Sequence, residues 1–121
     1  MAHVGLTEAK AKKRGISYVT YSLPFKEVDR AHTDGETEGT AKVICDRKGR
    51  VLGATILGSR AGEMIHEWVL AMKAKVPIGQ VSGTIHIYPT LSRINRKVAG
   101  RYYENVFQGT TGKVLKWLAK R

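Results

Sequence analysis

The chain has 121 residues, a formal net charge of +11 at pH 7 and one cysteine. This length suits one domain with its own hydrophobic core and leaves no room for a second fold. The sequence has no apolar run of about eighteen residues and no N-terminal signal pattern, which excludes a membrane-spanning helix and a secretory leader. We therefore expect a cytoplasmic protein.

Positive charge is concentrated in the C-terminal part. From Arg93 onward there are eight Lys or Arg residues and one acidic residue, Glu104, which together supply seven of the eleven net charges. No RNP aromatic motif or zinc-finger spacing accompanies them, so sequence-specific nucleic-acid binding is not supported. Residues 113–121 predict a short basic amphipathic helix with Trp117 at the boundary between its apolar and basic sides. Such a helix either docks on its own domain or makes a weak peripheral contact with an anionic membrane.

The N-terminal third predicts a helix followed by a strand. Leu6 to Arg14 is helical, with Thr7 as N-cap and Gly15 as the stop. Ile16 to Leu23 is rich in Tyr, Val and Thr and predicts a strand that ends at Pro24. Residues 25–33 fit neither pattern clearly, and residues 33–39 read as a polar turn region.

A β-hairpin is the clearest element of the sequence. Ala41, Val43 and Cys45 alternate on one face, residues 46–50 form a polar turn, and residues 51–57 form a nearly continuous apolar strand. Cys45 lies on the apolar face and has no CxxC partner. It is therefore predicted to be a small buried hydrophobe.

The hairpin is followed by an amphipathic helix over residues 61–75. Its apolar stripe comprises Ala61, Met64, Ile65, Trp68 and Met72. A Trp on such a stripe is typical of a core or a dimer interface. Glu63 and Glu67, one turn apart, have the spacing of an acid or metal-ligand pair, but exposed helix carboxylates are more often simply solvated.

The stretch Gly83 to Ile94, GTIHIYPTLSRI, is the best candidate for the functional site. Residues 77–81 are expected to be a connector that leads into an extended strand carrying His86 and Tyr88 on the same side. Pro89 ends this strand, and Thr90 caps a helix that buries Leu91, Ile94 and Val98. After Gly100 the chain is expected to form a loop through Gln108-Gly109.

Four blocks, in order, resemble the C-terminal dimerisation domain of the FAD-dependent pyridine nucleotide-disulfide oxidoreductases, the group of lipoamide dehydrogenase, glutathione reductase and mercuric reductase. They are Val4-Gly5-Leu6-Thr7-Glu8, Arg30-Ala31-His32-Thr33, Val51-Leu52-Gly53-Ala54 with Gly58 and Ala61-Gly62-Glu63-Met64-Ile65, and Thr84-Ile85-His86-Ile87-Tyr88-Pro89-Thr90-Leu91-Ser92, which is similar to the family motif HAHPTLSE. The blocks cover roughly residues 4–100. We therefore divide the chain into a dimerisation domain over 1–100 and a basic extension over 101–121.

The resemblance implies an α+β fold in which an antiparallel sheet carries helices on one side and pairs about a two-fold axis. It places Met64, Trp68, Met72 and His86 at the dimer interface, and Tyr88 and Pro89 against the flavin of the partner subunit. It also implies FAD and NAD(P) as cofactors of a longer parent, held by its FAD and nucleotide domains. This chain alone is expected to bind neither cofactor and to be inactive.

The sequence departs from the family motif at both catalytic positions. The second histidine of the motif is the family's acid-base catalyst, and Tyr88 stands in its place. Its glutamate partner is replaced by Arg93. A tyrosine with an ordinary pKa near 10 donates a proton but does not exchange one readily near neutral pH. His86, which matches the first histidine, is the alternative acid-base candidate.

Two other classes of function stay open at this point. One is a stand-alone dimeric interaction domain that kept the dimer surface without the catalytic domains. The other is a basic module that binds membrane or nucleic acid through the C-terminal tail.

Overall fold

The computed structural model describes residues 1–108 and 117–119. Along the chain the elements are β1 (Ala2–Gly5), α1 (Glu8–Lys13), β2 (Val19–Pro24), a 3-10 helix (Phe25–Glu27), α2 (Asp29–Thr33), β3 (Thr40–Cys45), β4 (Val51–Leu57), α3 (Ala61–Lys73), α4 (Ile78–Gly83) and α5 (Arg93–Gln108). Most of the amphipathic helix predicted for 113–121 therefore lies outside the described residues.

The four strands form one antiparallel sheet in the order β1-β4-β3-β2. The predicted hairpin is confirmed, with Val43 opposite Ala54, and β2 ends at Pro24 as expected. Side chains that alternate toward one face are buried, among them Leu23, Val43 and Ile56. The strand β1, which the sequence did not signal, pairs with β4 at the sheet edge.

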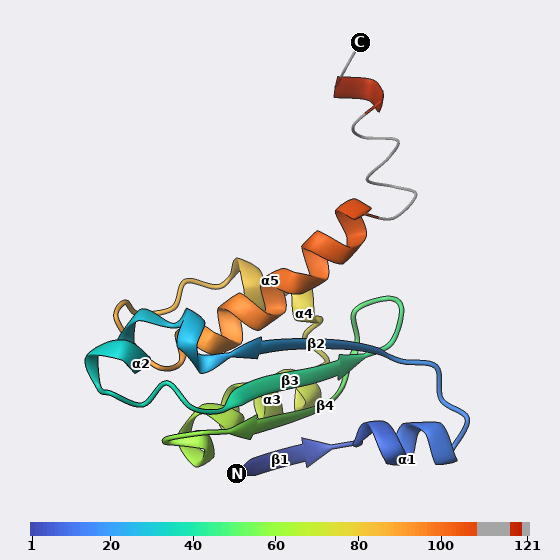
Figure 1. Cartoon of the computed structure of the whole chain (residues 1–121). Helices are drawn as coiled ribbons and strands as arrows, with labels where there is room; N and C mark the ends of the chain where they lie inside the picture. The colour runs from blue at the N-terminus through green and yellow to red at the C-terminus, as the bar shows by residue number, and fades with distance from the viewer. Residues whose placement is uncertain (109–116, 120–121) are drawn as a thin grey trace.

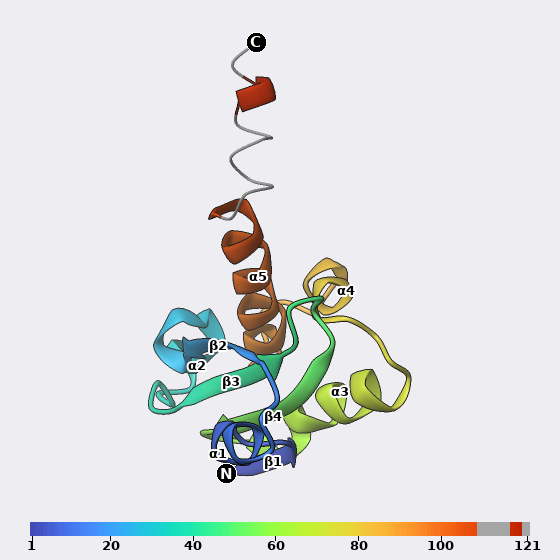
Figure 2. The same cartoon turned by 90° about the vertical axis from the view of Figure 1, so that its right-hand side faces the viewer.

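Helices α3, α4 and α5 form a layer on the apolar face of this sheet. α3 packs on β4 and β1, α5 packs on β2 and β3, and α4 packs on α5 (Figures 1 and 2). The short helix α1 begins as predicted, because the Thr7 side chain accepts a hydrogen bond from the backbone N–H of Lys10. The fold is the α+β arrangement that the family resemblance implies.

Three expectations for the second half of the chain are wrong. Residues 77–81 lie mostly in α4 rather than in a connector, and residues 84–88 are not a strand. The segment connects α4 to α5 and pairs with no strand of the described sheet, and an extended segment without a paired neighbour is not a strand. Helix α5 continues past Gly100 to Gln108, since its next turns pack Tyr102 against Tyr21.

The core lies between the sheet and α3, α4 and α5. Trp68 and Cys45 are fully buried, and burial raises the pKa of the Cys45 thiol to about 12, which confirms it as an inert core residue. Met64 is also buried within the chain. Trp68 has no exposed surface with which to reach a partner, so its assignment to a dimer interface is wrong. Met64 lines a surface hollow beside Thr90 and Leu91, and its assignment stays a prediction. None of the helices in the described part of the chain is long and apolar enough to span a membrane.

Close approach of the chain at Gly53 gives a test of the fold. A Cβ added there would lie 2.1 Å from the carbonyl oxygen of Leu6, whereas one added at Gly62 on α3 meets no atom within 4 Å. We expect Gly53→Ala to lower the free energy of unfolding by about 1–3 kcal/mol through overpacking. Gly62→Ala, the matched control, should raise it by about 0.5–1 kcal/mol, because alanine loses less backbone entropy in a helix. Urea denaturation followed by circular dichroism measures both, and equal effects would contradict the described packing.

Candidate functional site

The segment from Thr84 to Thr90 crosses from α4 to α5 as an irregular loop, hereafter the 84–90 loop. Its two central polar side chains point in different directions, because the chain is not extended here. His86 is turned inward, with 7% of its side chain exposed, and Tyr88 is turned outward, with 58% of the residue exposed. The Thr90 hydroxyl donates a hydrogen bond to the carbonyl of Ile87. Since α5 begins only at Arg93, Thr90 stabilises the loop and is not the helix N-cap that the sequence predicted.

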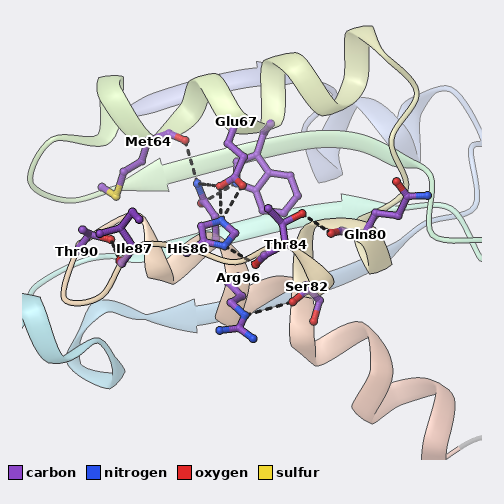
Figure 3. Close-up of polar contacts among 11 residues, drawn as sticks. Met64, Glu67, Gln80, Ser82, Thr84, His86, Ile87, Thr90 and Arg96 are labelled. Carbon is purple, nitrogen blue, oxygen red and sulfur yellow. Dashed lines mark hydrogen bonds and ion pairs between the residues drawn. The ribbon is translucent and has the colours of Figure 1, made fainter.

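The inward side of the loop is anchored by His86. One ring nitrogen, Nε2, lies 2.7 Å from a carboxylate oxygen of Glu67 on α3, and Nδ1 lies 2.9 Å from the carbonyl oxygen of Thr84 (Figure 3). Glu67 thus serves as an anchor for His86 rather than as half of a pair with Glu63. No cluster of three or more metal-ligating side chains occurs among the described residues.

Asn95 on α5 completes this anchor from the other side. It is fully buried, and its side-chain amide donates to the carbonyl of Met64 and to Glu67, at 3.0 and 2.9 Å. Its carbonyl oxygen accepts the indole N–H of Trp68 at 2.8 Å. One amide therefore joins α5 to α3 and, through Glu67, to the 84–90 loop. Every buried polar side-chain atom in the described residues has a partner.

The outward side of the loop presents Tyr88. Its hydroxyl donates a hydrogen bond of 2.9 Å to a carboxylate oxygen of Asp29 at the start of α2. The guanidinium of Arg93 lies over the phenol ring, 5.0 Å from its centroid, which is a cation–π contact. The Arg30 side chain donates to the carbonyl of Pro89 and is itself held by Asp34. The phenol is therefore fixed in orientation while it stays exposed.

This environment raises the pKa of Tyr88 above its ordinary value. The hydrogen bond to Asp29 is the main cause, and the negative charge of Asp29 adds to it, while the positive charge of Arg93 acts in the opposite direction. The phenol therefore stays protonated throughout the neutral range. Tyr88 is able to donate a proton or a hydrogen bond there, but it is not a base.

Of the three sequence-predicted catalytic residues, Tyr88 and Arg93 lie together, whereas His86 faces the other way and is engaged by Glu67. His86 is therefore in no position to replace Tyr88 at an exposed site. Sequence reasoning missed Asp29 and Asn95. Asn95 was detectable, because it is a polar residue within the apolar stripe of Leu91, Ile94 and Val98. Asp29 carried no signal, since it lies 59 residues from Tyr88.

Residues 1–98 match the model of the pyridine nucleotide-disulphide oxidoreductase dimerisation domain. The chain belongs to this family. Its relatives include dihydrolipoyl dehydrogenase of Bacillus subtilis, 39% identical over 82% of this chain and 21% of the relative, and the human mitochondrial enzyme, 38% identical over 80% and 19%. This dimerisation domain thus spans about a fifth of the length of these relatives.

Solved structures agree with this assignment. The HOCl-induced flavoprotein disulfide reductase RclA of Escherichia coli superposes with a TM-score of 0.77 at 30% identity, over 81% of this chain and 23% of that one. LpdA of Mycobacterium tuberculosis gives 0.76 at 25% identity, over 82% and 22%. Membership of a dimerisation-domain family supports self-association of this chain.

The central role of Asn95 is testable by truncation. We expect Asn95→Ala to lower the free energy of unfolding by about 1–3 kcal/mol, because it leaves the buried indole N–H of Trp68 unsatisfied and removes a donor from Glu67. Asn105→Ala removes an exposed amide from the same helix, with only a 3.5 Å contact to Tyr21, and should change it by less than about 0.5 kcal/mol. Thermal and urea unfolding compare the two. Similar losses for both variants would contradict the network.

The Tyr88–Asp29 pair predicts a titration shift. In Asp29→Asn the carboxylate that favours the protonated phenol is gone, so the pKa of Tyr88 should fall toward its ordinary value of about 10. Tyrosinate absorbance measured against pH reports this, once the Tyr88→Phe profile has been subtracted to isolate Tyr88. The control Glu38→Gln removes an exposed charge elsewhere and should leave the curve unchanged. An unshifted or raised pKa in Asp29→Asn would refute the pair.

Proposed function

We propose that this chain is the dimerisation domain of an FAD-dependent, NAD(P)-linked oxidoreductase in which Tyr88 takes the place of the family's acid-base histidine. The observation that carries the proposal is the geometry of Tyr88. Its hydroxyl is oriented by Asp29, its ring is covered on one side by Arg93, and it remains exposed on the loop that carries the family motif. The activity belongs to the full-length parent, because the relatives are about five times longer than the matched segment.

This chain would form one side of a flavin site and would not enclose the cofactor. The 84–90 loop offers Ile85, Ile87 and Tyr88, which are exposed by 86%, 74% and 58%. The hollow beside it, about 230 Å³, is bordered by Arg30, Arg60 and Glu63 and is small for a flavin ring. The flavin, which would supply the electron transfer, is thus expected to be held by the other domains of the parent.

The chemistry available to this side differs from that of the family pair. A histidine beside a glutamate both accepts and donates a proton near neutral pH, whereas the phenol of Tyr88, with its raised pKa, only donates. Arg93 adds a fixed positive charge beside it. We therefore infer that the parent reduces an acceptor that needs a hydrogen-bond donor or a proton in the transition state, and that it does not rely on proton exchange with a dithiol.

Self-association would use the exposed surface of α3 and the 84–90 loop. On α3, Val69 and Leu70 are exposed by 39% and 67%, and on the loop Ile85 and Ile87 are also exposed. Aliphatic side chains at such exposure are typical of a surface that a partner covers. These residues replace Trp68 among the proposed contacts, while Met64 lines the hollow beside the loop and Met72 is half-buried at the end of α3.

Removal of one hydroxyl in the full-length parent tests the proposal. Tyr88→Phe keeps the ring and should lower kcat by about tenfold to a thousandfold, the range expected when a general acid is lost. Flavin content and dimerisation should stay unchanged. Tyr103→Phe is the control, since Tyr103 is also exposed and its hydroxyl makes only a 3.4 Å contact with the Gly79 carbonyl. Steady-state kinetics with NADH and NADPH, each with the same acceptor, gives the comparison.

A double variant extends the same test. Tyr88→His with Arg93→Glu restores the family pair and should raise dithiol–disulfide turnover if the parent carries a redox cysteine pair. An unchanged rate in Tyr88→Phe would reject the proton-donor role. If the full-length parent also held no flavin, the alternative of a stand-alone interaction domain would be favoured.

A further inference from the structure

The two ends of the sheet differ in their balance of charge, because acids and cations are mixed at one end and cations predominate at the other. Six of the ten acidic residues lie around α2, the 33–39 turn and the start of α3, the end where Tyr88 is found; they are Glu27, Asp29, Asp34, Glu36, Glu38 and Glu63. At the other end lie the last turn of α1, the 46–50 turn between β3 and β4, and the end of α3 (Figure 2). We call these three segments the basic end. Its exposed cations are Lys12, Lys13, Arg14, Arg47, Lys48, Arg50, Lys73 and Lys75.

The charge of the basic end is largely uncompensated. None of its cations forms an ion pair with another described residue. The one acidic residue of the 46–50 turn, Asp46, accepts hydrogen bonds from the backbone N–H groups of Lys48 and Arg50. Its carboxylate therefore stabilises the turn and pairs with no cation among the described residues. The ends of α1 and α3 explain part of this distribution, since cations stabilise helix C-termini. They do not explain the cations of the 46–50 turn, which belong to no helix.

A hollow opens among these cations. It has a volume of about 410 Å³ and lies between the 46–50 turn and the end of α3. Lys48, Arg50 and Lys75 stand around it, and its other walls are aliphatic, formed by Val51, Leu52, Ala71, Met72, Val76 and Pro77. Positive side chains around an apolar hollow match a ligand that is anionic at one end and apolar at the other.

We propose that the basic end docks on a bilayer that contains anionic phospholipids. Lipid phosphates would meet the cations of the three segments, and the hollow would accept the apolar part of a lipid next to its headgroup. Nucleic acid is the other polyanion to consider, but bases bind by stacking on aromatic rings, and this hollow is lined by aliphatic side chains. Tyr102 and Tyr103 line a separate, neighbouring hollow of about 280 Å³. Tyr88 stays accessible in this orientation. It is hydrogen-bonded to Asp29 on α2, and α2 lies at the other end of the sheet (Figure 1).

The test measures binding of the complete chain to vesicles. Vesicles of phosphatidylglycerol mixed with phosphatidylcholine are compared with pure phosphatidylcholine by co-sedimentation, at low and at physiological salt. Lys48→Gln with Arg50→Gln should weaken binding to the anionic vesicles by about 25-fold, since each basic residue near an anionic surface contributes about fivefold. The matched control, Lys26→Gln with Arg60→Gln, removes one exposed lysine and one exposed arginine at the opposite end and should bind like the wild type.

A third variant separates the basic end from the C-terminal tail. Lys113→Gln with Lys116→Gln neutralises two tail cations, and the proposal requires that it weaken binding less than Lys48→Gln with Arg50→Gln does. Binding that is equal for neutral and anionic vesicles, or that only the tail variant weakens, would overturn the proposal. So would tighter binding of a single-stranded RNA than of anionic vesicles at physiological salt. None of these measurements uses flavin or turnover, so they are independent of the role of Tyr88.

Discussion

A single buried side-chain amide ties the parts of this domain together. Asn95 satisfies the Trp68 indole, the Met64 carbonyl and the Glu67 carboxylate, and Glu67 in turn holds His86. A complete network of this kind contributes modestly to the free energy of unfolding. Loss of any partner leaves a buried polar group unsatisfied, which costs about 1–3 kcal/mol. This asymmetry specifies one arrangement of α3, α5 and the 84–90 loop. The exposed face of that loop depends on it.

Two residues of this loop, His86 and Tyr88, thus have different roles. His86 is turned inward and fixes the backbone, while Tyr88 is turned outward and stays exposed. The same geometry explains why one residue cannot take over from the other. An irregular backbone between them, held by the contacts of Thr84, Thr90 and Arg30, replaces the regular alternation of a strand.

Charge divides the molecule along the direction of the sheet. Acidic and basic side chains are mixed at the Tyr88 end, where Asp29 orients the phenol and Arg30 pairs with Asp34. Cations that form no ion pair with another described residue gather at the other end, near the hollow beside α3. Because exposed charges are screened within about 8 Å at physiological salt, the two ends act on different neighbours. Net charge alone, which the sequence places mainly in the C-terminal tail, does not reveal this division.

Periodicity and local chemistry in the sequence determined the hairpin, the buried stripe of α3, the Thr7 cap and the burial of Cys45, because each depends on residues close together in the chain. The family motif likewise identified Tyr88 and Arg93. Only the tertiary structure decided that His86 faces inward, that Asp29 meets Tyr88, that Trp68 is core rather than interface, and that residues 84–88 are not a strand. Each of these depends on contacts between distant segments. A strand needs a neighbour to pair with, and a side chain turns toward whichever partner satisfies it, so no local pattern records either outcome.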